Sequence, residues 1–137
     1  MSDDPSIPIP VANFDNAEFW EGCRKHELRL QRCRQCGALR HPPRPMCPEC
    51  TSTDSEFARA SGRGSVYSFT VVHGPTLPAF QARAPYNVVV VQLDEGLYIV
   101  SNLVDCPADE IRIGMGVEAV FEDLDEQISL PKFRRIA

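Results

Sequence analysis

The stretch Cys33–Cys50, CRQCGALRHPPRPMCPEC, decides the fold of the N-terminal half because it holds two Cys-x-x-Cys pairs. Each pair directs two thiolates into one small volume, and two facing pairs supply the four soft ligands that tetrahedral zinc prefers. Gly37 follows the first pair, where a tight turn needs a residue able to adopt positive φ. We therefore predict a metal site whose ligands are Cys33, Cys36, Cys47 and Cys50.

The same cysteines allow alternatives to zinc. Iron binds the same four thiolates in rubredoxin, so the spacing does not separate the two metals. Two disulfides would need an oxidising compartment, and the N-terminus shows no basic-then-apolar signal segment. A thioredoxin-like redox pair would need one motif between a strand and a helix. With cysteine at all four positions, zinc keeps no open position for substrate, so we expect a structural site.

Length and composition limit the class of protein. A chain of 137 residues forms one domain or two small ones. It has no apolar run near the roughly 20 residues that span a bilayer, so we expect no membrane association. Six cysteines without a signal segment indicate a reducing cytoplasm. The formal net charge of −5 argues against nucleic acid as the main ligand, because phosphate binding relies on a basic field.

The chain divides into four segments. Residues 1–13 are proline-rich and are predicted to form an extended tail. Residues 14–31 hold a short amphipathic docking helix, for which Asp15 is the predicted N-cap, and a lead-in strand. Residues 32–56 are predicted to form the zinc ribbon, and residues 57–137 a barrel.

Five short strands are predicted in the barrel segment, because β-branched and aromatic residues cluster there between turn residues. They span residues 64–72, 86–93, 96–104, 117–121 and 128–133. A single helical turn at 107–110 precedes the fourth strand, an order that matches the OB fold, a small Greek-key barrel. The predicted fold class is mostly β, with an N-terminal helix and zinc ribbon followed by a five-stranded OB-fold barrel.

Two surfaces suit contact with a partner protein. Phe19 and Trp20 share one face of the predicted helix and form an aromatic patch of the kind enriched at interfaces. The alternative is that this patch docks on the chain's own domain. The loop 74–85 is stiffened by prolines and carries Phe80 and Arg83, which suits it better for contact than for chemistry.

Basic residues concentrate in one region. Residues 24–44 contain seven arginine and lysine residues against the single acid Glu27. They form either a solvated face that compensates the thiolate charge or a surface for an anionic partner or a phosphorylated ligand. We recognise no nucleophile–base arrangement and no glycine-rich phosphate loop, so no catalytic residue is predicted.

Several motifs together resemble a known family. They are LRLQRCRQCG at 28–37, PPR at 42–44, CPEC at 47–50, GRGSVYSFTVVH at 62–73, IGMGV at 113–117 and LPKFR at 130–134. In this order they resemble the acyl-CoA-associated OB-fold family with an N-terminal rubredoxin-like zinc ribbon. The resemblance covers about residues 14–136, and all four cysteine positions agree with the family pattern.

The resemblance implies an accessory subunit that is not an enzyme by itself. Such subunits accompany thiolase-superfamily proteins, including lipid-transfer-type thiolase-like aldolases. They support C–C bond cleavage of an acyl-CoA, either retro-aldol or thiolytic, in sterol or lipid side-chain degradation. It implies a hetero-oligomer. The expected contacts to the partner protein are Phe19, Trp20, Phe80 and Arg83, and those to the phosphates of CoA are Arg40 and Arg44.

Two other functions stay open at this point. A nucleic-acid-binding zinc-ribbon and OB module would bind single strands through a basic groove with stacking aromatic residues, and the acidic barrel half speaks against it. A free-standing acyl-CoA thioesterase or lyase would turn over substrate alone, and it would need a catalytic arrangement that the sequence does not reveal.

Overall fold

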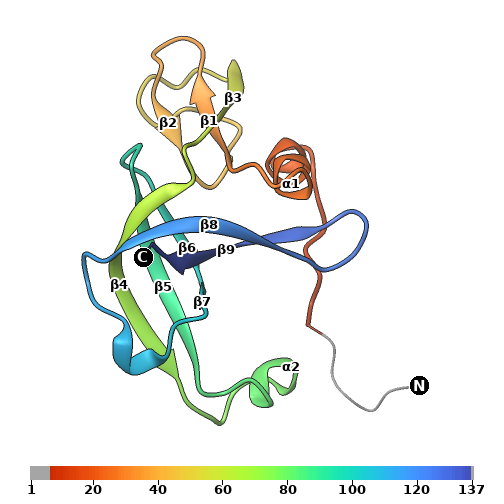
Figure 1. Ribbon diagram of the computed structural model, residues 1–137. Helices are drawn as coiled ribbons and strands as arrows, with labels where there is room; N and C mark the ends of the chain where they lie inside the picture. The colour runs from red at the N-terminus through yellow and green to blue at the C-terminus, as the bar shows by residue number, and fades with distance from the viewer. Residues whose placement is uncertain (1–6, 137) are drawn as a thin grey trace.

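The computed structural model describes residues 7–136. The N-terminal part forms a helix and a small three-stranded sheet, with bounds α1 Ala17–Arg24, β1 Arg29–Cys33, β2 Leu39–Arg40 and β3 Ser55–Arg59. The remainder forms a six-stranded sheet and two single helical turns, with bounds β4 Arg63–Val72, α2 Pro78–Gln81, β5 Tyr86–Leu93, β6 Tyr98–Ser101, β7 Leu103–Val104, η1 Ala108–Glu110, β8 Gly116–Asp123 and β9 Ser129–Arg135. In Figure 1 the small sheet stands at one end of the barrel, and α1 lies beside their junction. The predicted fold class is confirmed.

The ribbon sheet has the strand order β2-β1-β3, with both pairs antiparallel. Gln31 of β1 lies opposite Arg40 on one side and opposite Phe57 on the other. The sequence analysis did not predict β3, because its five residues include two charged ones and no clear alternation. Pairing with β1 stabilises this strand, and the ion pair between Arg32 and Glu56, at 3.2 Å, joins the two strands.

The start of α1 differs from the prediction. The N-cap is Asn16 rather than Asp15. The side-chain oxygen of Asn13 accepts hydrogen bonds from the backbone N–H groups of Asp15, at 2.9 Å, and Asn16, at 3.0 Å. The N–H of Asn13 in turn donates to the side-chain oxygen of Asn16 at 2.7 Å. The two asparagines thus organise the turn before the helix, and the predicted Asp15 cap is wrong.

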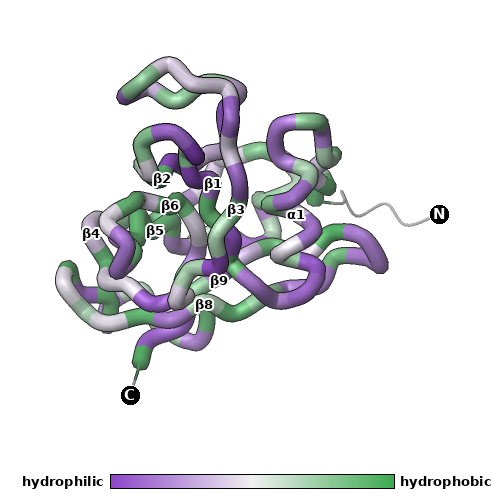
Figure 2. Tube along the Cα trace, turned by 90° about the horizontal axis from the view of Figure 1, so that it is seen from above, coloured by the Kyte–Doolittle hydropathy of each residue, from purple (hydrophilic) through white to green (hydrophobic). Residues whose placement is uncertain are grey.

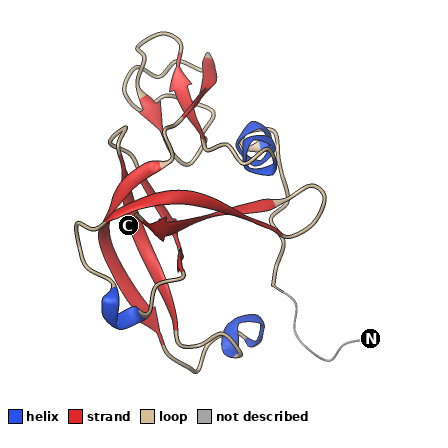
Figure 3. Cartoon of the chain, viewed as in Figure 1, coloured by secondary structure: helices blue, strands red, loops and turns tan. Residues whose placement is uncertain are grey.

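The barrel sheet, whose strands are drawn red in Figure 3, has the order β6-β5-β4-β8-β9-β7. The predicted strand 96–104 is divided at Asn102 into β6, which pairs with β5, and β7, which runs parallel to β9. The side chain of Asn87 holds this division, since it accepts a hydrogen bond from the N–H of Leu103 at 2.6 Å and donates to its C=O at 2.8 Å. The parallel pair closes the barrel, so the five predicted strands are present with the third in two pieces.

One hydrophobic core joins the helix, the ribbon and the barrel. Phe19 and Cys23 of α1 belong to the same buried cluster as Leu30 of β1 and as Val89 and Phe133 of the barrel. Burial raises the pKa of the Cys23 thiol to about 12, so this cysteine serves as a small apolar side chain. Figure 2 shows hydrophobic and hydrophilic segments alternating along the chain around this core. Within residues 7–136, no helix combines the length and apolar character needed to cross a membrane.

Candidate metal centre and binding groove

Four cysteine thiols converge in the ribbon. All four Sγ atoms lie within 4.8 Å of one another. Two of the distances join the opposite pairs: Cys33 Sγ to Cys50 Sγ is 3.5 Å, and Cys36 Sγ to Cys47 Sγ is 3.6 Å. A tetrahedron with metal–sulfur bonds of about 2.3 Å has sulfur–sulfur edges of about 3.8 Å. The four cysteines therefore fit the coordination sphere of a single metal ion.

The two halves of the site are built alike. The N–H of Gly37 donates to the C=O of Cys33 at 2.9 Å, and the N–H of Thr51 donates to the C=O of Cys47 at 2.9 Å. Gly37 and Thr51 both adopt positive φ, at 78° and 65°. Glycine favours this conformation, so Gly37 allowed the first turn to be predicted from the sequence. Threonine carries no such signal, so the second turn is visible only in the structure.

Backbone amides favour the thiolate form of the first cysteine in each pair. The N–H of Cys36 lies 3.5 Å from Cys33 Sγ and lowers the pKa of the Cys33 thiol to about 6. The N–H of Cys50 likewise lowers the pKa of the Cys47 thiol. Because metals bind the thiolate, these amides prepare the ligands for coordination. Four cysteine ligands leave no open position, so a metal held here has a structural role.

Buried polar side chains hold the loop between the two cysteine pairs. The side-chain oxygen of Gln31, which is 5% exposed, accepts a hydrogen bond from the N–H of Arg44 at 2.7 Å. The guanidinium of Arg40, which is 3% exposed, donates to the C=O of Arg44 at 2.9 Å. Arg40 therefore points into the ribbon, whereas the Arg44 side chain is exposed. Contact of Arg40 and Arg44 with the phosphates of CoA stays a prediction.

Most of the basic run is neutralised within the chain. Carboxylates lie within 4.0 Å of the basic groups of Arg24, Lys25, Arg29, Arg32 and Arg34. In the part of the chain that the structure describes, Arg44 has no such partner. These pairs favour a solvated, charge-compensated face over a broad anion-binding surface.

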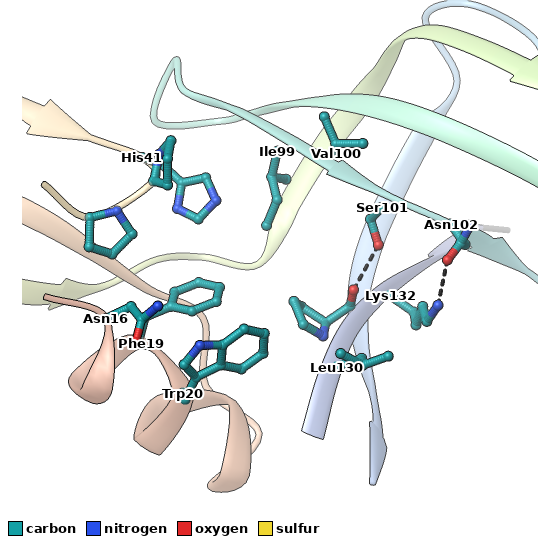
Figure 4. A pocket seen from close by; sticks show the side chains of 13 residues that line it. Asn16, Phe19, Trp20, His41, Ile99, Val100, Ser101, Asn102, Leu130 and Lys132 are labelled. Carbon is teal, nitrogen blue, oxygen red and sulfur yellow. Dashed lines mark hydrogen bonds between the residues drawn. The ribbon is translucent and has the colours of Figure 1, made fainter. Parts of the chain in front are cut away.

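A cavity of about 380 Å³ opens between α1, the ribbon and the barrel (Figure 4). Phe19 and Trp20 form its wall on α1, with ring centroids 5.1 Å apart, and the ring of His41 lies 5.2 Å from that of Phe19. Ile99 of β6 and Leu130 of β9 line the barrel side. Phe19 is buried and Trp20 is half-buried. Of these two predicted contact residues, Phe19 therefore belongs to the core and Trp20 lines the open cavity.

A second cavity, of about 530 Å³, lies next to the first and contains the other predicted pair, Phe80 and Arg83. The two cavities share the lining residues Asn102, Leu130 and Lys132, so they adjoin each other, and we refer to the two together as the groove. All four predicted partner-contact residues line one or the other of these cavities.

Lys132 lies where the two cavities meet, and the sequence analysis did not identify it. Its side chain is 13% exposed and its Nζ lies 3.9 Å from a carboxylate oxygen of Glu122. Nζ also donates to the side-chain oxygen of Asn102 (Figure 4). Burial lowers the pKa of the Lys132 ammonium, and the nearby Arg83 lowers it further. No local pattern marks this lysine, because its position follows from barrel closure.

Comparisons with known proteins agree with this architecture. The ChsH2 rubredoxin-like zinc ribbon domain matches residues 20–56, and the ChsH2 C-terminal OB-fold domain matches residues 58–122. A chain of the Ltp2-ChsH2(DUF35) aldolase has a similar structure, with a TM-score of 0.84 and 44% sequence identity. The match covers 92% of this chain and 98% of that one.

Two curated relatives are longer proteins. The chain is 45% identical over 127 residues to a probable enoyl-CoA hydratase alpha subunit of Thermomonospora curvata. It is 36% identical over 124 residues to the 3-oxo-4,17-pregnadiene-20-carboxyl-CoA hydratase alpha subunit of Mycobacterium tuberculosis. These matches cover 93% and 90% of this chain but 39% of each relative, so the chain spans about two fifths of their length.

Proposed function

The chain belongs to the ChsH2 family of zinc-ribbon and OB-fold proteins, as its motifs predicted, and we propose that it is a non-catalytic subunit of a thiolase-like aldolase. In this proposal it docks on the catalytic partner and supports C–C bond cleavage of an acyl-CoA. One observation carries the proposal: the match to a chain of an Ltp2-ChsH2 aldolase covers 98% of that chain at 44% identity.

The distribution of reactive groups supports a binding role. The imidazole of His26 lies on the surface, 2.8 Å from Asp123 and stacked on Phe121. His41 lies in the groove, and burial lowers the pKa of its imidazole. Cys23 is buried in the core and its thiol stays protonated. Each of these groups packs against or bonds to neighbouring residues, and the four thiols of the ribbon suit a metal.

We propose zinc as the metal, because the family's matching domain is a zinc ribbon and the four thiolates fit tetrahedral coordination. Bound zinc would cross-link the two cysteine pairs and stabilise the loop that forms one wall of the groove. Iron would occupy the same ligands. Elemental analysis of protein purified without added metal distinguishes the two.

The groove is the proposed docking surface. Trp20 is half-buried and Arg83 is exposed, so both side chains reach a partner without unfolding the core. The ring of Phe19 packs edge-to-face against that of Trp20, and Phe80 packs against Tyr86 with ring centroids 6.0 Å apart. Aromatic anchors seated in a groove are the residues that dominate protein interfaces.

The name of one relative supports a proposed substrate class. The Mycobacterium tuberculosis relative is named as a subunit of a hydratase for a pregnadiene-carboxyl-CoA. We therefore propose a steroid or lipid side-chain acyl-CoA as the substrate of the complex, and a cytoplasmic location in which the ribbon thiols stay reduced.

Co-expression with an Ltp2-type aldolase, followed by size-exclusion chromatography, tests the docking. We expect the two chains to co-elute. Trp20→Ala should weaken the complex, whereas the exposed His73→Ala should not. Separate elution of the two wild-type chains at micromolar concentration would rule out the proposed subunit. Binding of a single-stranded oligonucleotide in the same experiment would instead favour the nucleic-acid alternative.

A further inference from the structure

Arg40 is the one charged side chain among the buried polar residues of the described chain, and it is 3% exposed. One of its amino groups donates to the C=O of Arg44 at 2.9 Å. Its Nε and Nη1 atoms are buried and have no hydrogen-bond partner among residues 7–136. Within the same residues, no carboxylate oxygen lies within 4.0 Å of the guanidinium. The ribbon therefore encloses a cation that no carboxylate neutralises.

The hydrogen bond to Arg44 does not explain why this side chain is charged. A guanidinium stays protonated when it is buried, and a buried cation without a counter-charge is strongly unfavourable. The neutral amide of Gln31 holds the N–H of Arg44 at 2.7 Å, so uncharged groups can fix this loop. We therefore expect a group of opposite charge near Arg40.

The register of the ribbon sheet places Arg40 on the same face as a ligand cysteine. Arg40 lies directly opposite Gln31, and Gln31 is two residues before Cys33 on β1. Directly opposed residues share a face of a sheet, as do residues two apart on one strand. The burial agrees, because Gln31 is 5% and Cys33 is 1% exposed, whereas Arg32 between them points to the other face and is exposed.

Hydrogen bonds connect the guanidinium to the strand residue that pairs with this cysteine. Arg40 holds the C=O of Arg44, and Gln31 holds its N–H. The Gln31 amide also donates to the hydroxyl of Ser55 at 3.0 Å. Ser55 lies directly opposite Cys33 in the sheet. These bonds fix the position of the cation relative to the four thiols.

The four thiols supply the charge of opposite sign once they bind a metal. Cysteine coordinates as the thiolate, so a divalent ion with four cysteine ligands carries a net double negative charge. A cation on the same buried face interacts with this charge more strongly than in water, because the effective dielectric is lower. The exposed Arg32 and Arg34 are paired with Glu56 and screened by solvent, so they contribute little.

We infer that Arg40 is the internal counter-charge of the metal–thiolate centre, and that its buried guanidinium stabilises the negative charge that the thiolates bring into the ribbon. The inference rests on the proposed metal site, because without a metal the thiolates would not gather this charge. It gives the positive charge of Arg40 a role that needs no contact with CoA.

Competition between the purified full chain and a chelator for zinc tests the inference. Arg40→Gln keeps a hydrogen-bond donor for the C=O of Arg44 but removes the charge, and it should lower zinc affinity about tenfold, as is usual for groups that support metal ligands. Arg40→Lys keeps the charge and should restore most of the affinity. Arg32→Gln is the matched control, since it removes an exposed charge from the opposite face of the same sheet, and it should bind zinc as wild type does.

The reduction potential of the iron-loaded chain gives a second readout, which a purely structural role would not move in this way. Reduction adds one negative charge to the centre, so the loss of a nearby cation makes reduction harder. A tenfold change in the preference for the reduced form corresponds to about 59 mV for one electron. The potential should fall by about this amount in Arg40→Gln and stay near the wild-type value in Arg40→Lys and Arg32→Gln.

Three results would overturn the inference. One is a zinc affinity and a potential that are both unchanged in Arg40→Gln. Another is an equal loss in Arg40→Gln and Arg40→Lys, which would mean that the shape of the side chain matters and its charge does not. The third is an equal loss in Arg32→Gln, which would assign the effect to the overall charge of the ribbon. Melting temperatures show whether Arg40→Gln folds, and if it does not, Arg40→Met takes its place in the same comparison.

These outcomes are separable from a failure of the proposed function. If the wild-type chain binds neither zinc nor iron, the proposed metal site fails and the role of Arg40 fails with it. If wild type and Arg40→Gln bind metal equally well, the metal site stands and only the counter-charge is lost. Co-elution with the aldolase is measured independently of both.

Discussion

Replacing Asn87 with alanine should destabilise the barrel at the point where it closes. The Asn87 side chain makes two hydrogen bonds to the backbone of Leu103, a residue that is 3% exposed. Alanine leaves the N–H and C=O of Leu103 unpaired and shielded from water. At about 1–3 kcal/mol for each buried group left unsatisfied, the expected loss is about 3 kcal/mol. For a chain of this length, that corresponds to a melting temperature lowered by about 10 °C.

Thermal and urea denaturation of the metal-loaded protein measure this loss. Gln92→Ala is the matched control, because Gln92 lies on the same strand, is exposed, and makes only a 3.5 Å contact with the Tyr98 hydroxyl. It should change stability by less than about 0.5 kcal/mol. The Asn87 variant should also weaken binding in the groove, since Asn87 and Leu103 both line its second cavity. A melting temperature of Asn87→Ala within about 2 °C of the wild-type value would refute the reasoning.

Three further predictions concern metal binding, the dependence of stability on acidic pH, and the interface with the partner. Cys47→Ser should abolish stoichiometric metal binding and unfold the ribbon, because structural metal binding is itself folding free energy; elemental analysis checks this, and a full metal equivalent in the variant would contradict it. Hydrogen bonds from Ser129 and His26 lower the pKa of Asp123 below its usual 3.8, so its stabilising effect is present above pH 3.8 and is lost as the pH falls through the lower folded value. Wild type should therefore exceed Asp123→Asn in stability at pH 6 and lose this advantage in acid, and a constant difference would argue against it. Trp20→Ala should weaken the aldolase complex at least about tenfold, as expected for an aromatic anchor, and an unchanged dissociation constant would remove Trp20 from the interface.

The parts of the fold that depend on local sequence were predictable. The two Cys-x-x-Cys pairs place their thiols together through short turns, and the structure has all four Sγ atoms within 4.8 Å of one another. The strand at 86–93 was predicted with the bounds it has, because its apolar run is long and β-branched. In both cases the residues that decide the structure are neighbours in the chain.

The parts that depend on distant residues were not predictable. The strand β3 forms because β1 pairs with it, and its own residues give little signal. The break at Asn102 follows from bonds to Asn87, which lies 15 residues earlier. The groove is a sharper case: Arg83 and Lys132 are brought to one cavity only when β9 and the loop after β4 meet at barrel closure. The sequence therefore suggested Arg83 as a contact residue but gave no reason to pair it with Lys132.

Two residues that were predicted to make surface contacts, Arg40 and Phe19, are buried in the structure. Arg40 looked like a surface cation in a basic run, but it is 3% exposed and bonds the backbone of Arg44. Phe19 looked like half of an exposed patch, but it is 6% exposed and belongs to the core. Side-chain direction at these positions is decided by how the ribbon and α1 pack on the barrel, and the linear sequence does not contain that information.

The most direct test of the central proposal is an acyl-CoA cleavage assay with three samples: the Ltp2-type aldolase alone, this chain alone, and the purified complex. A steroid side-chain β-hydroxyacyl-CoA is the substrate, and release of the short acyl-CoA is measured. We predict turnover by the complex, little or none by either chain alone, and recovery of activity when the separate chains are mixed. Full activity of the aldolase without this chain, or turnover by this chain alone, would contradict the proposal.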